Sequence, residues 1–183
     1  MPQRYFDVSD NVNIRGRWHI DTPVSVTGQQ IDSWQFTEGH PVEISERLRM
    51  PIYVMGTPLD FTMAGLDIPV VRVKVASIFT ELAPNDVQFL PVDIDGQPPE
   101  QFRILVATKL IQCIDEKTSE DVRHWKPEDG RPEKVGRYRV VSGMRIAPSK
   151  VANAKVFRTW GWTVALIVSE DIKVALERIG CTG

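Results

Sequence analysis

The chain has 183 residues, of which 25% are charged and 42% are hydrophobic, a balance typical of a soluble globular protein and unlike that of a disordered or fibrous one. No apolar run approaches the roughly 20 residues that span a bilayer, and the N-terminus lacks the apolar stretch of a signal peptide. Two cysteines do not make a disulfide framework, so the composition favours a reduced, cytoplasmic protein. The length predicts a single domain over residues 1–183.

The net charge of -2 hides an uneven distribution along the chain. Residues 1–100 carry 14 acidic and 7 basic side chains (-7), and residues 101–183 carry 10 acidic and 15 basic ones (+5), which together give -2. Two interpretations are open. Either the two halves attract each other within one domain, or the acidic half meets and steers a basic partner.

The first 68 residues predict a loop-rich part of the domain. Short apolar pieces at 5–8, 34–36, 42–44 and 52–54 lie between clusters of Asn, Asp, Gly and Pro. Such a pattern is typical of short strands joined by long loops.

A helix is predicted over 69–82, where the α+β core of residues 69–183 begins. Apolar side chains recur there with helical spacing, and Ala83-Pro84 closes the segment. The stripe consists of Val71, Val75, Ile78, Phe79 and Leu82. Because Val71, Val73 and Val75 also alternate, a strand at the start of this segment stays open.

Five β-rich segments follow, at 86–94, 102–108, 110–115, 138–141 and 144–146. The first two are joined by Asp95-Gly96-Gln97-Pro98-Pro99, which predicts a hairpin connection. Residues 116–136 are polar and rich in charged side chains, so we expect them to form an exposed excursion.

The last 28 residues predict a β-hairpin followed by a helix. Strands at 156–159 and 162–168 flank the turn Trp160-Gly161, and Ser169 then caps a helix that runs to about residue 179. Its apolar stripe is Ile172, Ala175, Leu176 and Ile179, and Gly180 ends it. The whole pattern predicts an α+β fold in which a few helices pack on an antiparallel or mixed sheet.

The sequence offers no catalytic, cofactor-binding or metal-binding motif. It contains no HExxH, CxxC, GxxxxGK[ST], GxGxxG or GxSxG pattern. Cys113 lies in an apolar run and is expected to be a core residue, whereas Cys181 is expected to be a surface thiol without a role. With a pI of about 5.9, the chain is not expected to bind nucleic acid.

Trp125 is the best candidate for an exposed aromatic anchor among the five tryptophans. It lies in Arg123-His124-Trp125-Lys126-Pro127-Glu128-Asp129, where no apolar neighbour is available to bury it. Tryptophan is enriched at protein interfaces because it buries a large area at a small entropic cost.

Several short blocks resemble a known bacterial family. They are Arg4-Tyr5-Phe6-Asp7-Val8, residues 84–92 from Pro84 to Val92, Cys113-Ile114-Asp115 with Ser119, Phe157-Arg158, residues 166–173, Leu176-Glu177, and Gly180-Cys181-Thr182-Gly183. In this order and spacing they resemble the eleventh numbered immunity family of bacterial polymorphic toxin systems, long described as a domain of unknown function. The family pattern usually continues beyond Thr-Gly, whereas this sequence ends at Gly183.

This resemblance implies a non-enzymatic protein that neutralises a cognate toxin through a tight complex. Many toxins that cleave nucleic acid are basic, so the acidic balance of residues 1–100 would suit an inhibitor of such a toxin. From exposure alone, we expect toxin contacts at Asp93, Asp95, Trp125, Glu128 and Asp129. The sequence leaves self-association open.

Two alternatives stay open. One is a small enzyme whose site is assembled from residues far apart in the sequence, such as His19, Asp21, Asp115 and His124. The other is a regulatory or structural module of a secretion apparatus that has no toxin partner.

Overall fold

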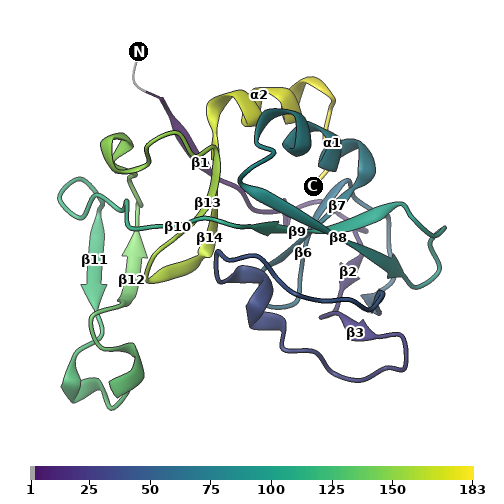
Figure 1. The fold of residues 1–183 in the computed structure, drawn as a ribbon, viewed down its shortest axis with the longest axis horizontal. Coiled ribbons are helices and arrows are strands. Elements are labelled where there is room, and N and C mark those ends of the chain that lie inside the picture. Colours follow the sequence, from purple (N-terminus) through teal and green to yellow (C-terminus); the bar gives the residue numbers. More distant parts are fainter. Residues whose placement is uncertain (1–2) are drawn as a thin grey trace.

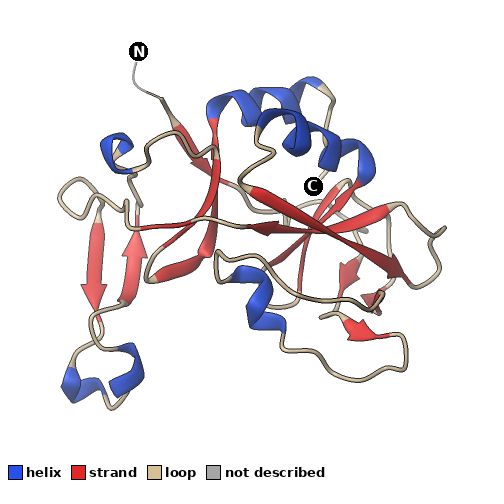
Figure 2. Ribbon diagram, in the orientation of Figure 1, coloured by secondary structure: helices blue, strands red, loops and turns tan. Residues whose placement is uncertain are grey.

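Two β-sheets pack together, and two α-helices lie side by side over them (Figures 1 and 2). The computed structural model describes residues 3–183. The fold is α+β with mixed sheets, as predicted, and its C-terminal hairpin is followed by a helix.

The larger sheet has six strands in the order β3-β4-β8-β9-β7-β6. Its strands are β3 (Val24–Ser25), β4 (Leu48–Met50), β8 (Val87–Ile94), β9 (Phe102–Ala107), β7 (Ile68–Arg72) and β6 (Phe61–Ala64). Neighbouring strands are antiparallel except for the parallel pair β4 and β8. The hairpin predicted from 86–94 and 102–108 is confirmed as β8 and β9.

The smaller sheet has four strands in the order β1-β14-β13-β10. They are β1 (Tyr5–Asp7), β14 (Trp162–Ser169), β13 (Val156–Thr159) and β10 (Leu110–Ile111). Two further pairs of strands are β2 (His19–Ile20) with β5 (Ile52–Val54), and β11 (Asp121–His124) with β12 (Tyr138–Ser142). The helices are α1 (Val73–Leu82) and α2 (Glu170–Arg178).

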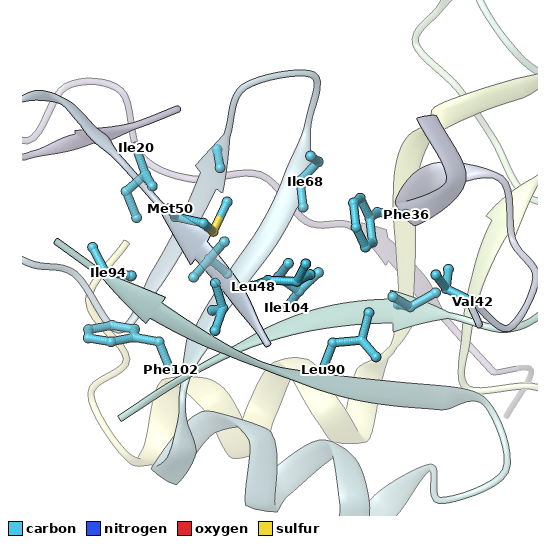
Figure 3. Packing of buried hydrophobic residues seen from close by; sticks show 14 of the residues in the cluster. Ile20, Phe36, Val42, Leu48, Met50, Ile68, Leu90, Ile94, Phe102 and Ile104 are labelled. Carbon is cyan, nitrogen blue, oxygen red and sulfur yellow. The ribbon is translucent and has the colours of Figure 1, made fainter. Parts of the chain in front are cut away.

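Alternate side chains of the central strands enter different cores, so both faces of each sheet are covered. In β9, Phe102, Ile104 and Val106 join the first core, whereas Leu105 and Ala107 join the second. The first core fills the space between the larger sheet and the N-terminal loops (Figure 3). Burial on both faces explains why the strand sequences are nearly continuous apolar runs.

The second core joins the two sheets to the helices. Val71 of β7 and Phe79 of α1 meet Leu166 and Val168 of β14 there, together with Ile172 of α2. A third core covers the opposite face of the smaller sheet. The C-terminal hairpin and α2 therefore complete the interior of the protein.

The helix predicted over 69–82 begins four residues too early. Pro69–Arg72 belong to β7, which pairs with β6 and β9, and α1 starts only at Val73. Val71 shares the second core with Val75 and Phe79, which explains why the stripe looked continuous. The alternative start as a strand, left open by the valine alternation, is the correct one.

Other short apolar pieces were assigned wrongly. Residues 34–36 lie in a 3-10 helix, η1 (Ser33–Thr37), because Asp32 caps its first turn by accepting from the Trp34 amide. Residues 42–44 form no strand, the strand expected over 110–115 stops at Ile111, and 144–146 contribute a single bridge from Ile146. The excursion expected at 116–136 is confirmed as exposed, since none of its residues is buried, and the sequence did not predict the strand β11 within it.

The terminal helix matches its prediction at the N-terminus better than at the C-terminus. Ser169 precedes α2 as expected, although its hydroxyl bonds to the Asp171 carboxylate and does not cap a backbone amide. Ile172 is fully buried, whereas Ile179 at the end of the stripe is exposed. Gly180 adopts a left-handed conformation with φ of 62°, as a residue that ends a helix often does.

The chain end is fixed to the larger sheet through Asp60, just before β6. The Asp60 carboxylate accepts from the Thr182 amide at 3.0 Å and pairs with Lys74 at 2.8 Å, while the Asp60 amide donates to the Thr182 carbonyl at 2.9 Å. Burial opposes ionisation of this carboxyl, but the hydrogen bonds from Lys74 and Thr182 outweigh it and hold the pKa of Asp60 below its ordinary value.

We predict that Asp60→Asn lowers the free energy of unfolding by about 1–3 kcal/mol at pH 7, because it removes a buried, charge-assisted hydrogen-bond acceptor. The lowered pKa means that this contribution is present above the ordinary value of 3.8 and is lost as the pH falls through the folded-state pKa. Urea unfolding at pH 7 and at acid pH measures both effects. Equal stability of the two proteins at pH 7 would contradict the prediction.

Candidate functional site

A β-hairpin projects from the body and carries three of the contact residues expected from the sequence (Figure 1). We call residues 115–147 the arm. Within the arm, the Tyr138 hydroxyl donates to Glu116 at 2.8 Å, and the Tyr138 ring lies 4.7 Å from that of His124. Burial, and then the Glu116 carboxylate, raise the pKa of Tyr138 to about 12. The ring packs on Gly161, where a Cβ would come within 3.0 Å of it.

Trp125 near the end of the arm is half-buried, although the sequence made it the best candidate for an exposed tryptophan. Lys134 Nζ lies 5.2 Å from the centre of its ring and Arg139 Cζ lies 5.0 Å away. Both distances allow cation–π attraction between these charged groups and the indole. Charged side chains therefore lie against a tryptophan that has no apolar neighbours in the sequence.

The two acidic candidates on the arm already have basic partners. Asp129 accepts from the Lys126 amide at 2.9 Å and from Arg139 at 2.5 Å, and these contacts hold its pKa below the ordinary value. Glu128 lies 3.8 Å from Lys126. Residues 125–137 carry four basic and three acidic side chains, so this end of the arm is not an acidic surface.

The two acidic candidates at the end of β8, Asp93 in the strand and Asp95 just after it, are paired in a similar way. Arg47 bonds to both carboxylate oxygens of Asp93, at 2.5 and 2.8 Å, and Arg49 bonds to both oxygens of Asp95, each at 2.6 Å. The hydrogen bond from Arg47 lowers the pKa of Asp93. Parallel pairing of β4 with β8 brings these arginines to the turn, and a sequence contains no direct signal for that pairing.

The histidines and carboxylates of the enzyme alternative are not brought to one place. His19 and Asp21 line a concave site of about 550 Å³ beside β2, whereas Asp115 and His124 belong to the arm. Among residues 3–183, no hydrogen bond or ion pair joins His19 to Asp21. The same residues contain no group of three or more His, Cys, Asp or Glu side chains that could hold a metal ion.

A second concave site of about 370 Å³ lies where α1 leads into β8. Pro84, Asn85 and Asp86, from one of the blocks that carry the family resemblance, form part of its wall. The buried Asp86 carboxylate accepts from the Lys155 amide at 2.7 Å. It therefore helps to fix the start of β13, since the Val156 amide also donates to it at 3.4 Å.

Both thiols are poorly suited to nucleophilic chemistry. Cys113 is fully buried, as expected, and burial raises its pKa to about 11. Cys181 is half-buried against the second core, not a surface thiol as expected, and burial followed by the charge of Asp60 raises its pKa to about 11. A raised pKa keeps a thiol protonated near neutral pH.

Sequence reasoning missed a surface of exposed apolar side chains beside the 550 Å³ site. Tyr53, Val54 and Met55 follow one another at β5 and are all exposed, and Val12 and Leu66 lie at the rim of the site. The apolar piece at 52–54 correctly predicted a strand, which is β5. An apolar run does not indicate whether another element covers it, so the sequence contained no signal of its exposure.

The fold defines a small α+β protein with exposed apolar side chains beside β5 and, among residues 3–183, no group of His, Cys, Asp or Glu side chains that could hold a metal ion. No curated protein matches the chain. A sequence model described as "Immunity protein family (Imm11)" matches residues 1–183, so the chain belongs to this immunity protein family. In residues 3–183, no helix is long and apolar enough to cross a membrane.

We predict that a disulfide reagent reacts far more slowly with the folded protein at pH 8 than with the urea-unfolded protein. A pKa of about 11 in place of 9.0 gives about 100-fold less thiolate, since each unit changes the thiolate fraction about tenfold. Release of the coloured thiol measures the rate, and Cys181 should react before Cys113. Rapid reaction of Cys113 in the folded protein would contradict the prediction.

Proposed function

We propose that this protein neutralises a cognate toxin by forming a stable non-covalent complex, without catalysis. Membership of the immunity family carries the proposal. Two structural features support it: the candidate reactive groups are dispersed, and exposed apolar side chains gather at one surface. Rigid sheets beneath a contact surface favour tight binding because little conformational entropy is lost on association.

We further propose a single domain, a cytoplasmic location and a basic, nuclease-type toxin. The larger sheet combines strands from both parts of the chain: β3, β4 and β6 come from the first 68 residues, and β8 and β9 come from the remainder. Strand β7 begins at Ile68, where the two parts meet. A sheet shared in this way supports one folding unit.

The proposal of a basic toxin is supported by how the charges pair. Among the ion pairs of residues 3–183, only Glu100 with Arg103 joins an acid of residues 1–100 to a base of 101–183. The acidic excess of the N-terminal half is thus not cancelled by ion pairs with the C-terminal half.

We predict that the protein restores growth to cells that express the toxin encoded beside its gene, and that the purified pair elutes from a sizing column as one species. Both results follow if inhibition requires only binding. Toxin that stays active and elutes separately at micromolar concentrations of both proteins would contradict the proposal.

The contacts expected at Asp93, Asp95, Trp125, Glu128 and Asp129 remain part of the proposal. Because Glu128 is the most exposed of these carboxylates, we predict that Glu128→Lys slows association with a basic toxin by about twofold to tenfold and flattens its salt dependence. Glu177→Lys on α2 is the control with the same change of charge. Identical association rates for the two variants would remove the arm from the proposed contact surface.

A further inference from the structure

The exposed apolar side chains beside β2 and β5 gather at one concave site. Tyr53, Met55 and Val12 are 79%, 76% and 75% exposed, and Leu66 is 44% exposed. Tyr53, Val12 and Leu66 line the site of about 550 Å³. Exposed apolar side chains grouped around a concavity are typical of a contact surface, whereas scattered ones need no explanation. We call Val12, Tyr53, Val54, Met55 and Leu66 the β5 face.

The wall of this site includes a turn with an unfavourable backbone. Leu66 and Asp67, which join β6 to β7, have φ of 62° and 58°, a region that costs an ordinary side chain about 1–2 kcal/mol per residue. The Gly65 amide donates to the Ile20 carbonyl at 3.2 Å, and Arg158 bonds to the Asp67 carbonyl at 3.4 Å. The surrounding structure thus holds an exposed leucine and an exposed carboxylate in a conformation that they do not favour.

Two carboxylates that line the site form no ion pair in the described residues 3–183, although the charge of the buried Arg158 acts on Asp67. Among residues 3–183, neither Asp21 nor Asp67 forms an ion pair, and Asp21 accepts hydrogen bonds only from the amide and hydroxyl of its neighbour Thr22. The site also contains Asp10 and Arg17, but these side chains pair with each other, and Asp10 accepts in addition from the Met63 amide. The unpaired charge at the rim is therefore negative.

An arginine or lysine on an apolar protein surface complements this combination. Its charged group would lie between Asp21 and Asp67, and its stem or flanking apolar side chains would cover Tyr53 and Met55. The exposed ring of Tyr53 adds an attraction for cations. A second copy of this chain is a poorer partner, because two-fold pairing of this face would bring the same carboxylates together. Anionic lipid is disfavoured for the same electrostatic reason.

We propose that the β5 face is the surface that docks the cognate toxin, through a basic side chain that enters the site between Asp21 and Asp67. This inference rests on the proposed function, since it names where that complex forms. The arm then contributes to the approach of the toxin or to peripheral contacts, and the β5 face determines how long the complex lasts.

Binding kinetics with the toxin encoded beside the gene test the proposal. The double change Tyr53→Ser with Met55→Ser removes exposed side chains only, so the fold should be unaffected, and we expect the complex to dissociate at least about tenfold faster. Asp21→Asn with Asp67→Asn should slow association and flatten its salt dependence, and asparagine tolerates the backbone of position 67. Val174→Ser on α2, which removes an exposed valine elsewhere, is the control and should change neither rate.

Leu66→Asn separates binding from stability. Asparagine adopts the positive φ of this turn more readily than leucine, so the variant should melt at the same temperature as the unaltered protein or higher, and yet its complex should dissociate faster. Hydrogen exchange of the complex should show protection at residues 53–55 and 64–67.

Distinct outcomes separate failure of this proposal from failure of the proposed function. A complex that dissociates at the same rate with all the β5-face variants overturns the docking surface and leaves toxin binding intact. Weakening by Trp125→Ala but not by those variants would assign docking to the arm and also overturn it. A dimer of this chain that disappears in the β5-face variants would show that a second copy is the occupant. Absence of any complex with the unaltered protein overturns both proposals.

Discussion

The buried guanidinium of Arg158 links the two sheets, and the arrangement of the proposed docking surface depends on it. From β13, Arg158 bonds to the Val164 and Thr163 carbonyls at 3.0 and 3.2 Å and reaches the Asp67 carbonyl of the β6–β7 turn. Burial lowers its pKa to about 10, and the charges of Asp67 and then Asp7 oppose that shift. A charge buried at this cost needs fixed acceptors, so the turn and the hairpin hold each other in place. Its Nε has no hydrogen-bond partner among residues 3–183.

Pairing of charges within the protein decides which groups remain for recognition. At the end of β8, Arg47 and Arg49 form ion pairs with Asp93 and Asp95. On the arm, Arg139 forms an ion pair with Asp129. The carboxylates at the β5 face differ, because Asp21 and Asp67 face solvent beside exposed apolar side chains. Such a combination offers apolar surface that a partner can bury and a negative charge that favours a basic partner. The sheets behind it are already folded, so less conformational entropy is lost on binding.

The sequence predicted the parts of the fold in which local pattern and tertiary packing agree. The hairpin of β8 and β9 and the terminal hairpin with α2 follow from apolar runs separated by turn residues. Where the two conflict, the sequence failed: Val71 continues the stripe of α1 but lies in a strand, because pairing with β9 decides its backbone. The candidate site was harder to predict from the sequence than the fold. Neither the arginine partners of Asp93 and Asp95 nor the exposure of Tyr53 can be read from neighbours in the sequence, since both depend on which distant segments pack nearby.

Titration of toxin activity with increasing amounts of this protein tests the central claim most directly, namely that immunity comes from occupying a surface of the toxin. The account predicts that activity falls linearly and is abolished at a fixed molar ratio, with no further loss on longer incubation. It also predicts that active toxin is recovered when the complex is dissociated. Progressive inactivation by a small fraction of one equivalent would show turnover and would contradict the account.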